Sequence, residues 1–254
     1  MAFQYLGEIT GGLAPVRKNV QIAANVYQGQ LLRWDVNAGG SVEPMAGAAA
    51  GPDTTSYVAG ICMGPGRYTS MASLYNGTYK GDLLTYDTTQ ATLAVNDPVG
   101  AAICELQLLT PNSLVRAPLV KDTIGTNPER KACTTGSTDG LTFIIATIDT
   151  TVSNYSTAYC SLGANRGEYR KITTGAAATQ TVLVPFTNDI AIGDTFCVVN
   201  VADGLAHVDL DTQFQGIDTS PALTNYYVVY VHELNLEEAG REYATFRFAP
   251  RHFA

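Results

Sequence analysis

Three short stretches of the chain follow one pattern, in which a glycine precedes a polar residue and then a run of apolar, β-prone side chains. They read GQLLRWD, GDLLTYD and GDTFCVVN, at residues 29–35, 81–87 and 193–200. Glycine adopts positive-φ turn conformations that other residues avoid, so each stretch predicts a chain reversal that opens a strand. Turn residues and a second β-prone segment follow each stretch, at residues 41–44, 91–95 and 205–210. The pattern predicts three β-hairpins and a chain built mainly of sheets.

Composition indicates a folded protein without a nucleic-acid partner. The 254 residues are 46% hydrophobic, which is enough to bury a core. Only 15% are charged, which is typical of surfaces that lie against other subunits and equally of an all-β chain with few helices. Acidic residues outnumber basic ones by 23 to 15, and the densest basic groups, at residues 166–171 and 241–251, stand beside glutamates. Because a phosphate backbone is bound by clustered Lys and Arg, these groups are interpreted as solvated or ion-paired charges.

Neither a membrane span nor a secretion signal is predicted. The chain has no run of eighteen apolar residues, and residues 1–12 lack both a basic head and a continuous apolar stretch. Synthesis in the cytoplasm is expected, with no membrane partner. The cysteines fit a reducing compartment, because they are odd in number, widely spaced and without a CxxC pair. They are interpreted as small core side chains in strands: Cys62, Cys104, Cys133, Cys160 and Cys197.

The spacing of strands and turns predicts an all-β chain with two domains. Residues 1–19 contain several glycines and a proline, and are expected to form an extended arm that adds strands to a neighbouring subunit or else stays unstructured. Residues 20–118 form a hairpin-built domain, and the prolines of residues 110–118 indicate a boundary. Residues 119–254 begin with a polar loop at 121–140 and continue as eight short strands, which predict a β-sandwich or jelly-roll-like domain. Only residues 234–241 are expected to form a helical turn.

Catalytic groups are sparse in the sequence. A Ser or Cys nucleophile needs a base, and the three histidines, His207, His232 and His252, occur in no pattern typical of a triad or a zinc site. No phosphate-binding glycine loop is present either. The chain is therefore predicted not to be an enzyme and to need no cofactor.

The one acidic cluster, ADGLAHVDLD, contains Asp203, Asp209 and Asp211. Alternate residues of a strand share a face, which would place the side chains of Asp209 and Asp211 about 7 Å apart. Two such carboxylates are weak candidates for a Ca²⁺ site or a glycosidase pair. Charges that block a sheet edge from pairing are the commoner explanation.

The first half of the chain resembles the small β-rich cement or decoration proteins of tailed-phage heads. The resemblance covers about the first 110 residues and lies in strand order and glycine placement: Val20–Ala23, GQLLRWD, Ser41–Pro44, Ala59–Ile61, KGDLLTYD and VGAAI at 99–103. It implies a β-tulip-like domain, a homotrimer, and attachment to the major capsid protein outside the virion shell, where such proteins tie capsomers together. Members of that family are shorter, so residues 121–254 would be an added domain.

Two other functions remain open from the sequence. A carbohydrate-binding or fibre-type virion sandwich would use Tyr155, Tyr159, Tyr226 and Tyr227 as stacking platforms and give the second domain a glycan contact. Alternatively the same tyrosines pack the core. A hydrolase would use Asp209 and Asp211.

Overall fold

The computed structural model describes residues 2–22, 26–35, 40–45, 57–65, 79–80, 83–84, 103–121, 126–145, 156–176, 178–210, 215–219 and 227–253. These residues form strands almost throughout, and the helix found among them is the single 3-10 turn η2 (Pro250–His252). The all-β prediction is confirmed. The helical turn expected at residues 234–241 is absent, because a strand continues to Asn235 and a turn follows it. No helix in the described part of the chain is long and apolar enough to cross a membrane.

The chain divides into two compact units. Unit 1 comprises residues 1–116 together with 247–254, and unit 2 comprises residues 117–246. The chain enters unit 2 within β10 (Ser113–Val120), a strand in the segment that the sequence suggested as a boundary loop, and leaves it within β20 (Tyr243–Phe248). The last eight residues of the chain therefore belong to the first unit, although they follow the second in sequence.

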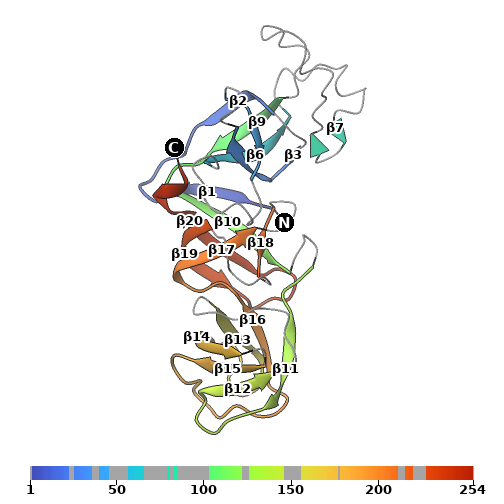
Figure 1. The fold of residues 1–254 in the computed structure, drawn as a ribbon, viewed down its shortest axis with the longest axis vertical. Coiled ribbons are helices and arrows are strands. Elements are labelled where there is room, and N and C mark those ends of the chain that lie inside the picture. Colours follow the sequence, from blue (N-terminus) through green and yellow to red (C-terminus); the bar gives the residue numbers. More distant parts are fainter. Residues whose placement is uncertain are drawn as a thin grey trace. The chain divides into compact units, whose positions relative to one another are not determined.

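Unit 1 contains a curled antiparallel sheet of five strands (Figure 1). Across the sheet these strands are β2 (Val16–Gln21), β9 (Ile103–Leu108), β6 (Val58–Pro65), β4 (Leu31–Trp34) and β5 (Val42–Pro44). A parallel bridge between Ile22 and Val42 connects the segment after β2 with β5, so the two outer strands of the sheet meet. Both side chains are fully buried in the core that this curling encloses.

The first predicted hairpin is present in unit 1. Gly29 has φ of 76°, and a Cβ at this position would lie 2.5 Å from the Ala2 Cβ. Both the backbone conformation and the lack of space therefore favour glycine here. The turn leads into β4, which pairs with β5 through residues 42–44 as predicted. The second glycine-led stretch contributes β8 (Leu83–Leu84), between β3 (Val26–Tyr27) and β7 (Tyr79–Lys80), and its predicted return strand at 91–95 lies outside the described residues.

The expected arm at residues 1–19 is instead paired within its own chain. β1 (Gln4–Glu8) pairs with the first half of β10, and β2 pairs with β9. The Glu8 carboxylate accepts hydrogen bonds from the hydroxyls of Thr110 and Ser113, at 2.6 and 2.5 Å. It also accepts one from the Tyr5 hydroxyl at 3.1 Å. β1 and β2 are therefore strands of the chain's own sheets, and β1 lies at the edge of its sheet.

Unit 2 contains a closed barrel of six strands (Figure 1). Around the barrel they are β11 (Arg130–Thr135), β12 (Thr142–Ile145), β15 (Thr179–Val182), β14 (Tyr169–Ala176), β13 (Thr157–Leu162) and β16 (Thr195–Val199). β11 closes the ring by pairing with β12 on one side and β16 on the other. Closure removes every strand edge, which is the main aggregation hazard of a sheet.

Three aromatic rings fill the barrel. Phe143 stacks on Phe196 with ring centroids 4.2 Å apart, and Phe186 meets Phe196 edge to face at 5.4 Å. All three are almost fully buried, together with smaller aliphatic and cysteine side chains. The barrel is therefore a packed core with side chains in place of a channel, as its small strand number requires.

The rest of unit 2 forms a mixed sheet, and here the third predicted hairpin is wrong. Gly193 does open a strand, with φ of 95°, but that strand is β16 of the barrel. The following segment, β17 (Gly204–Leu210), pairs with β18 (Ile217–Asp218) and β19 (Tyr227–Asn235). The end of β10 continues the sheet beyond β18, and β20 lies beyond β19. Two successive strands thus join different sheets.

The second half also differs from the predicted sandwich or jelly roll. Six of its strands close on themselves, whereas a sandwich needs two open sheets packed face to face. The difference comes from β11, which lies in the polar stretch that the sequence suggested as a loop. Only Cys133 of this strand is buried, so hydrophobic alternation could not reveal it.

Substituting Gly60 in β6 with alanine tests the packing of unit 1. A Cβ at this position would lie 2.0 Å from the backbone oxygen of Gln107, which cannot move without displacing β9. We expect Gly60→Ala to lower the free energy of unfolding by roughly 2–4 kcal/mol, measured by urea denaturation. An unchanged free energy of unfolding in Gly60→Ala would contradict the steric argument.

Candidate functional site

One end of the barrel gathers three connections, which we call the loop end: residues 136–141, 163–168 and 183–194. Strand register places them together, since Leu162 at the end of β13 lies opposite Thr195 at the start of β16. Backbone bonds also join them, because the Phe186 amide donates to the Gly140 carbonyl at 3.0 Å. The loop end is thus a continuous part of unit 2.

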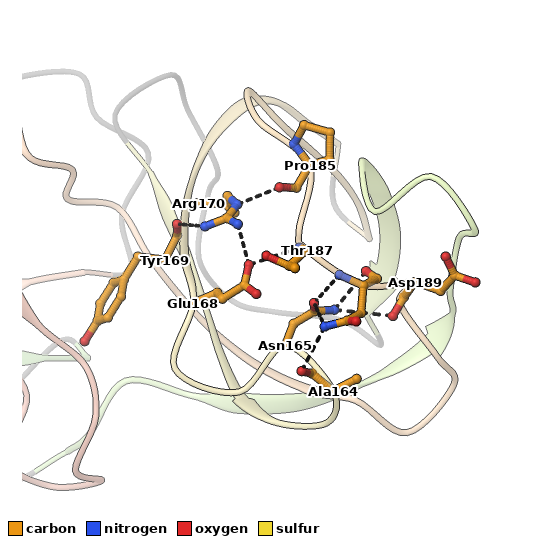
Figure 2. A network of polar contacts seen from close by, with 9 residues as sticks. Ala164, Asn165, Glu168, Tyr169, Arg170, Pro185, Thr187 and Asp189 are labelled. Atoms are coloured by element: carbon orange, nitrogen blue, oxygen red, sulfur yellow. Dashed lines mark hydrogen bonds and ion pairs between the residues drawn. The ribbon is translucent and has the colours of Figure 1, made fainter.

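A buried asparagine holds two of these connections together (Figure 2). The Asn165 Oδ1 accepts a hydrogen bond from the Asn188 amide at 2.7 Å, and its Nδ2 donates to the carbonyls of Asn188 and Asp189, at 3.1 and 3.3 Å. The Asn188 Nδ2 donates in turn to the Ala164 carbonyl at 3.2 Å. Because Asn165 is 1% exposed, its amide supplies bonds that water cannot replace.

An ion pair fastens the same connections at a second point (Figure 2). The Arg170 guanidinium binds the Glu168 carboxylate and donates through Nε to the Pro185 carbonyl at 2.8 Å. The Glu168 carboxylate also accepts a hydrogen bond from the Thr187 backbone amide, at 3.1 Å. The guanidinium also lies over the Phe186 ring, 5.2 Å from its centroid, and so connects the surface network with the barrel core.

Four aliphatic side chains project from this fastened surface into solvent. Leu162, Leu183, Val184 and Ile192 each have more than half of their surface exposed, and Ile192 reaches 76%. Isolated exposed aliphatic residues are ordinary, but three on the connections and one at the end of β13 give this barrel end an apolar character. Since the loops beneath them are already held by hydrogen bonds, little further ordering is needed when they contact a partner.

Unit 1 presents a second apolar turn of the same kind, which we call the Leu13 turn. Leu13 is 80% exposed and Ile9 is half exposed, on either side of Gly11 and Gly12. Both glycines have positive φ, near 83° and 91°, which is why the chain can reverse here. Glu8, the residue before the turn, is held by the hydroxyl groups described above. The turn is therefore fixed at its base and apolar at its tip.

A buried ion pair supports the opposite side of the barrel. The Glu242 carboxylate is almost fully buried and accepts from Arg130 Nη2 at 2.9 Å and from the Gly240 amide at 2.7 Å. The same Arg130 nitrogen donates to the Leu236 carbonyl at 2.7 Å. The guanidinium also lies over the Tyr159 ring, 5.8 Å from its centroid. Glu242 is thus bound through both carboxylate oxygens within unit 2, as expected of a structural ion pair.

The predicted acidic pair takes a different form in the structure. Asp209 lies half-buried on β17, whereas Asp211 lies outside the described residues. The register brings Asp218 of β18 opposite Asp209. Burial raises the pKa of Asp209 to about 6; the Leu210 amide, which donates to Oδ1 at 2.8 Å, opposes the rise, and the Asp218 charge adds to it. Partial burial also raises the pKa of Asp203, which lies in the bend before β17.

The three histidines lie in different surroundings. His252 is buried in unit 1 with its ring edge-on to Phe248, at 6.3 Å. In unit 2, His207 lies opposite Val228, while His232 is exposed further along β19. Across the residues that the structure describes, no three His, Cys, Asp or Glu side chains are arranged to hold a metal ion.

Two of the four tyrosines proposed as a stacking platform are buried. Tyr159 and Tyr227 are only 4% and 3% exposed. Tyr159 packs on the ring of Tyr169, with centroids 4.7 Å apart, and so belongs to the supporting side of the barrel. Tyr155 and Tyr226 lie outside the described residues. The core-packing interpretation therefore holds for the two described tyrosines.

Sequence reasoning missed the loop end and the Leu13 turn. The side chains that shape the loop end, Asn165 and Glu168, bond backbone groups 23 and 19 residues away, which local sequence patterns do not reveal. The exposure of the leucines could not be predicted either, because an aliphatic residue in a β-prone segment is normally expected to be buried. Comparisons of the chain with protein-family models, curated proteins and solved structures found no match.

Asn165→Ala tests the anchoring of the loop end. The substitution removes one acceptor and one donor group from buried backbone partners, so we expect the free energy of unfolding to fall by about 1–3 kcal/mol. Thr187→Ala, whose contribution to the network is its backbone amide, is the matched control and should change stability little. Chemical denaturation measures both, and an Asn165→Ala protein as stable as the control would refute the anchoring role.

Asp209→Asn tests the buried carboxylate through its pH dependence. In the unfolded chain an aspartate titrates near pH 3.9, so the folded-state pKa of about 6 means that ionised Asp209 opposes folding above pH 6. We expect the variant to be more stable than wild type by about 1–2 kcal/mol at pH 8, after allowing for partial solvent screening. The gain should disappear as the pH falls from 6 to 4. Asp189→Asn is the exposed control, and a pH-independent gain would contradict the assignment.

Proposed function

We propose that this chain is a structural protein of a tailed-phage virion, a decoration or cement protein that binds the outside of the capsid. Its partner is the major capsid protein, and its role is to stabilise contacts between capsomers. The proposal rests on the resemblance of the first 110 residues and on one structural observation. Each unit presents exposed aliphatic side chains on a turn or loop that is fixed by hydrogen bonds.

Covering these exposed side chains with a partner lowers the free energy of the complex. Burying apolar surface contributes roughly 25 cal/mol per Å², so Ile192, Leu183 and Leu13 each stabilise a complex when a partner covers them. A flexible loop would lose much of that gain to ordering, and the loops here are held in place beforehand. A protein that only attaches needs this kind of surface more than a cleft of titratable groups.

Two attachment surfaces suit a symmetric shell. A contact with a capsid protein needs about 1,000 Å² of buried area to be stable by itself, and weaker contacts suffice when several act together. A homotrimer repeats each surface three times and so raises the effective concentration of every further contact. In this proposal the protein folds in the host cytoplasm and joins the virion exterior through the loop end, the Leu13 turn or both.

Co-sedimentation with empty shells tests the proposal. Shells of the phage that encodes this chain, assembled without it, are mixed with wild-type protein and with an Ile192→Asp/Leu183→Asp variant. We expect saturable binding of the wild type and at least a tenfold higher Kd for the variant, because two charges replace apolar contacts. Leu205→Asp is the control, since Leu205 is an exposed leucine on β17 outside both surfaces.

Two outcomes would contradict this function. Wild-type protein that stays in the supernatant at saturating concentration would refute shell binding, and equal occupancy by the double variant would remove the loop end from the attachment. Light scattering of the free protein checks the trimer, for which we expect three times the 27.0 kDa of one chain. A monomer at all concentrations would contradict that part.

A further inference from the structure

Two of the five cysteines lie together in the core of unit 1. Cys62 is on β6 and Cys104 on β9, and these strands are antiparallel neighbours. Both side chains are fully buried in one hydrophobic cluster, and their thiols are hydrogen-bonded to each other. β6 has an irregular register between Cys62 and Gly64, and such a bulge increases the local bend and twist of a strand. The bend explains how Cys62 reaches Cys104, whose direct partner on β6 is Pro65.

The three cysteines of unit 2 have different surroundings. Cys133 and Cys160 donate to the carbonyls of Thr135 and Leu162, at 3.0 and 3.3 Å. Burial raises the pKa of Cys160 to about 11 and that of Cys197 to about 12, so these groups stay protonated. A core position is sufficient to explain each of them.

The thiol pair is polarised by its own hydrogen bond. The Cys104 thiol donates to the Cys62 sulfur, which lowers the pKa of Cys62 despite its burial. The same bond and burial raise the pKa of Cys104, which therefore remains the donor. A thiolate is the nucleophilic form of cysteine, so the two members have distinct chemical roles.

We propose that Cys62 and Cys104 form an oxidation site, at which a small peroxide converts the two thiols into a disulfide that joins β6 to β9. The Cys62 thiolate attacks one oxygen of hydrogen peroxide, which breaks the O–O bond, leaves a sulfenic acid and releases hydroxide. The Cys104 sulfur then attacks the Cys62 sulfur and displaces the sulfenic oxygen, which leaves as water with the Cys104 proton. The released hydroxide takes up a proton from solvent. In total, two thiols lose two electrons, and one peroxide becomes two waters.

The disulfide would close a covalent loop within unit 1. It would tie together the two ends of residues 63–103, and closing a long loop lowers the entropy of the unfolded chain. Peroxide is small enough to enter through local opening of the strands. Unit 1 would be made with free thiols in a reducing cytoplasm and become more stable after exposure to an oxidising medium. The inference does not depend on the proposed function.

Thiol counting tests the site directly. The purified full chain is treated with hydrogen peroxide, unfolded in the presence of N-ethylmaleimide and weighed by mass spectrometry. We expect three alkylated cysteines where the untreated protein has five, and a Cys62–Cys104 cross-linked peptide after proteolysis. Thermal unfolding without reductant should show the Tm of oxidised protein raised by roughly 5–10 °C, and dithiothreitol should reverse the rise.

Variants test the pairing. Cys104→Ala removes the partner thiol, so all four remaining cysteines should still be alkylated after peroxide treatment. Cys133→Ala, another buried cysteine replaced in the same way, should still form the Cys62–Cys104 disulfide. Five alkylated cysteines after peroxide treatment, or cross-links that join other cysteines, would overturn the site. An unchanged Tm in protein that carries the disulfide would overturn its stabilising effect.

Discussion

The pairing of β11 with both β12 and β16 is the constraint on which unit 2 depends. With this strand in place every barrel strand has two neighbours, and the rings of Phe143, Phe186 and Phe196 pack inside. An opened ring would expose backbone donors and acceptors on two edges and let water reach the aromatic core. The pairing of β13 with β14 and β16 brings residues 163–168 and 183–194 to one end of the barrel, where Asn165 bonds across them. The loop end is therefore a consequence of strand pairing within the barrel.

The two units share a design in which polar groups fix a turn and apolar groups cover it. In unit 1 the Glu8 carboxylate holds the base of the Leu13 turn, and in unit 2 Asn165 and Glu168 hold the loops that carry Ile192. In each case the polar anchor is shielded and the aliphatic tip is exposed. An ordinary surface loop is mobile, whereas these loops are held by hydrogen bonds before any partner binds. Preformed loops of this kind suit a protein that binds through shape.

The buried titratable groups differ in how their charge is held. Glu242 is bound by Arg130 and a backbone amide, whereas Asp209 faces Asp218 across two paired strands. Cys62 and Cys104 lie together in the core of unit 1, and for this pair we propose oxidation to a disulfide. That proposal concerns the stability of unit 1.

The sequence by itself determined the features that depend on neighbouring residues. The glycine at 29 and the β-prone run after it specified the first hairpin, and apolar alternation predicted most strands of the second half, because turns and side-chain alternation are local properties. Strand partners were decided only by the tertiary structure. β16 and β17 follow one another in the chain yet join different sheets, and Asp209 faces Asp218 across a pairing that the spacing of Asp209 and Asp211 could not show. The physical reason is that pairing is settled by which strands close the barrel and bury a common core, and that depends on residues far apart in the sequence.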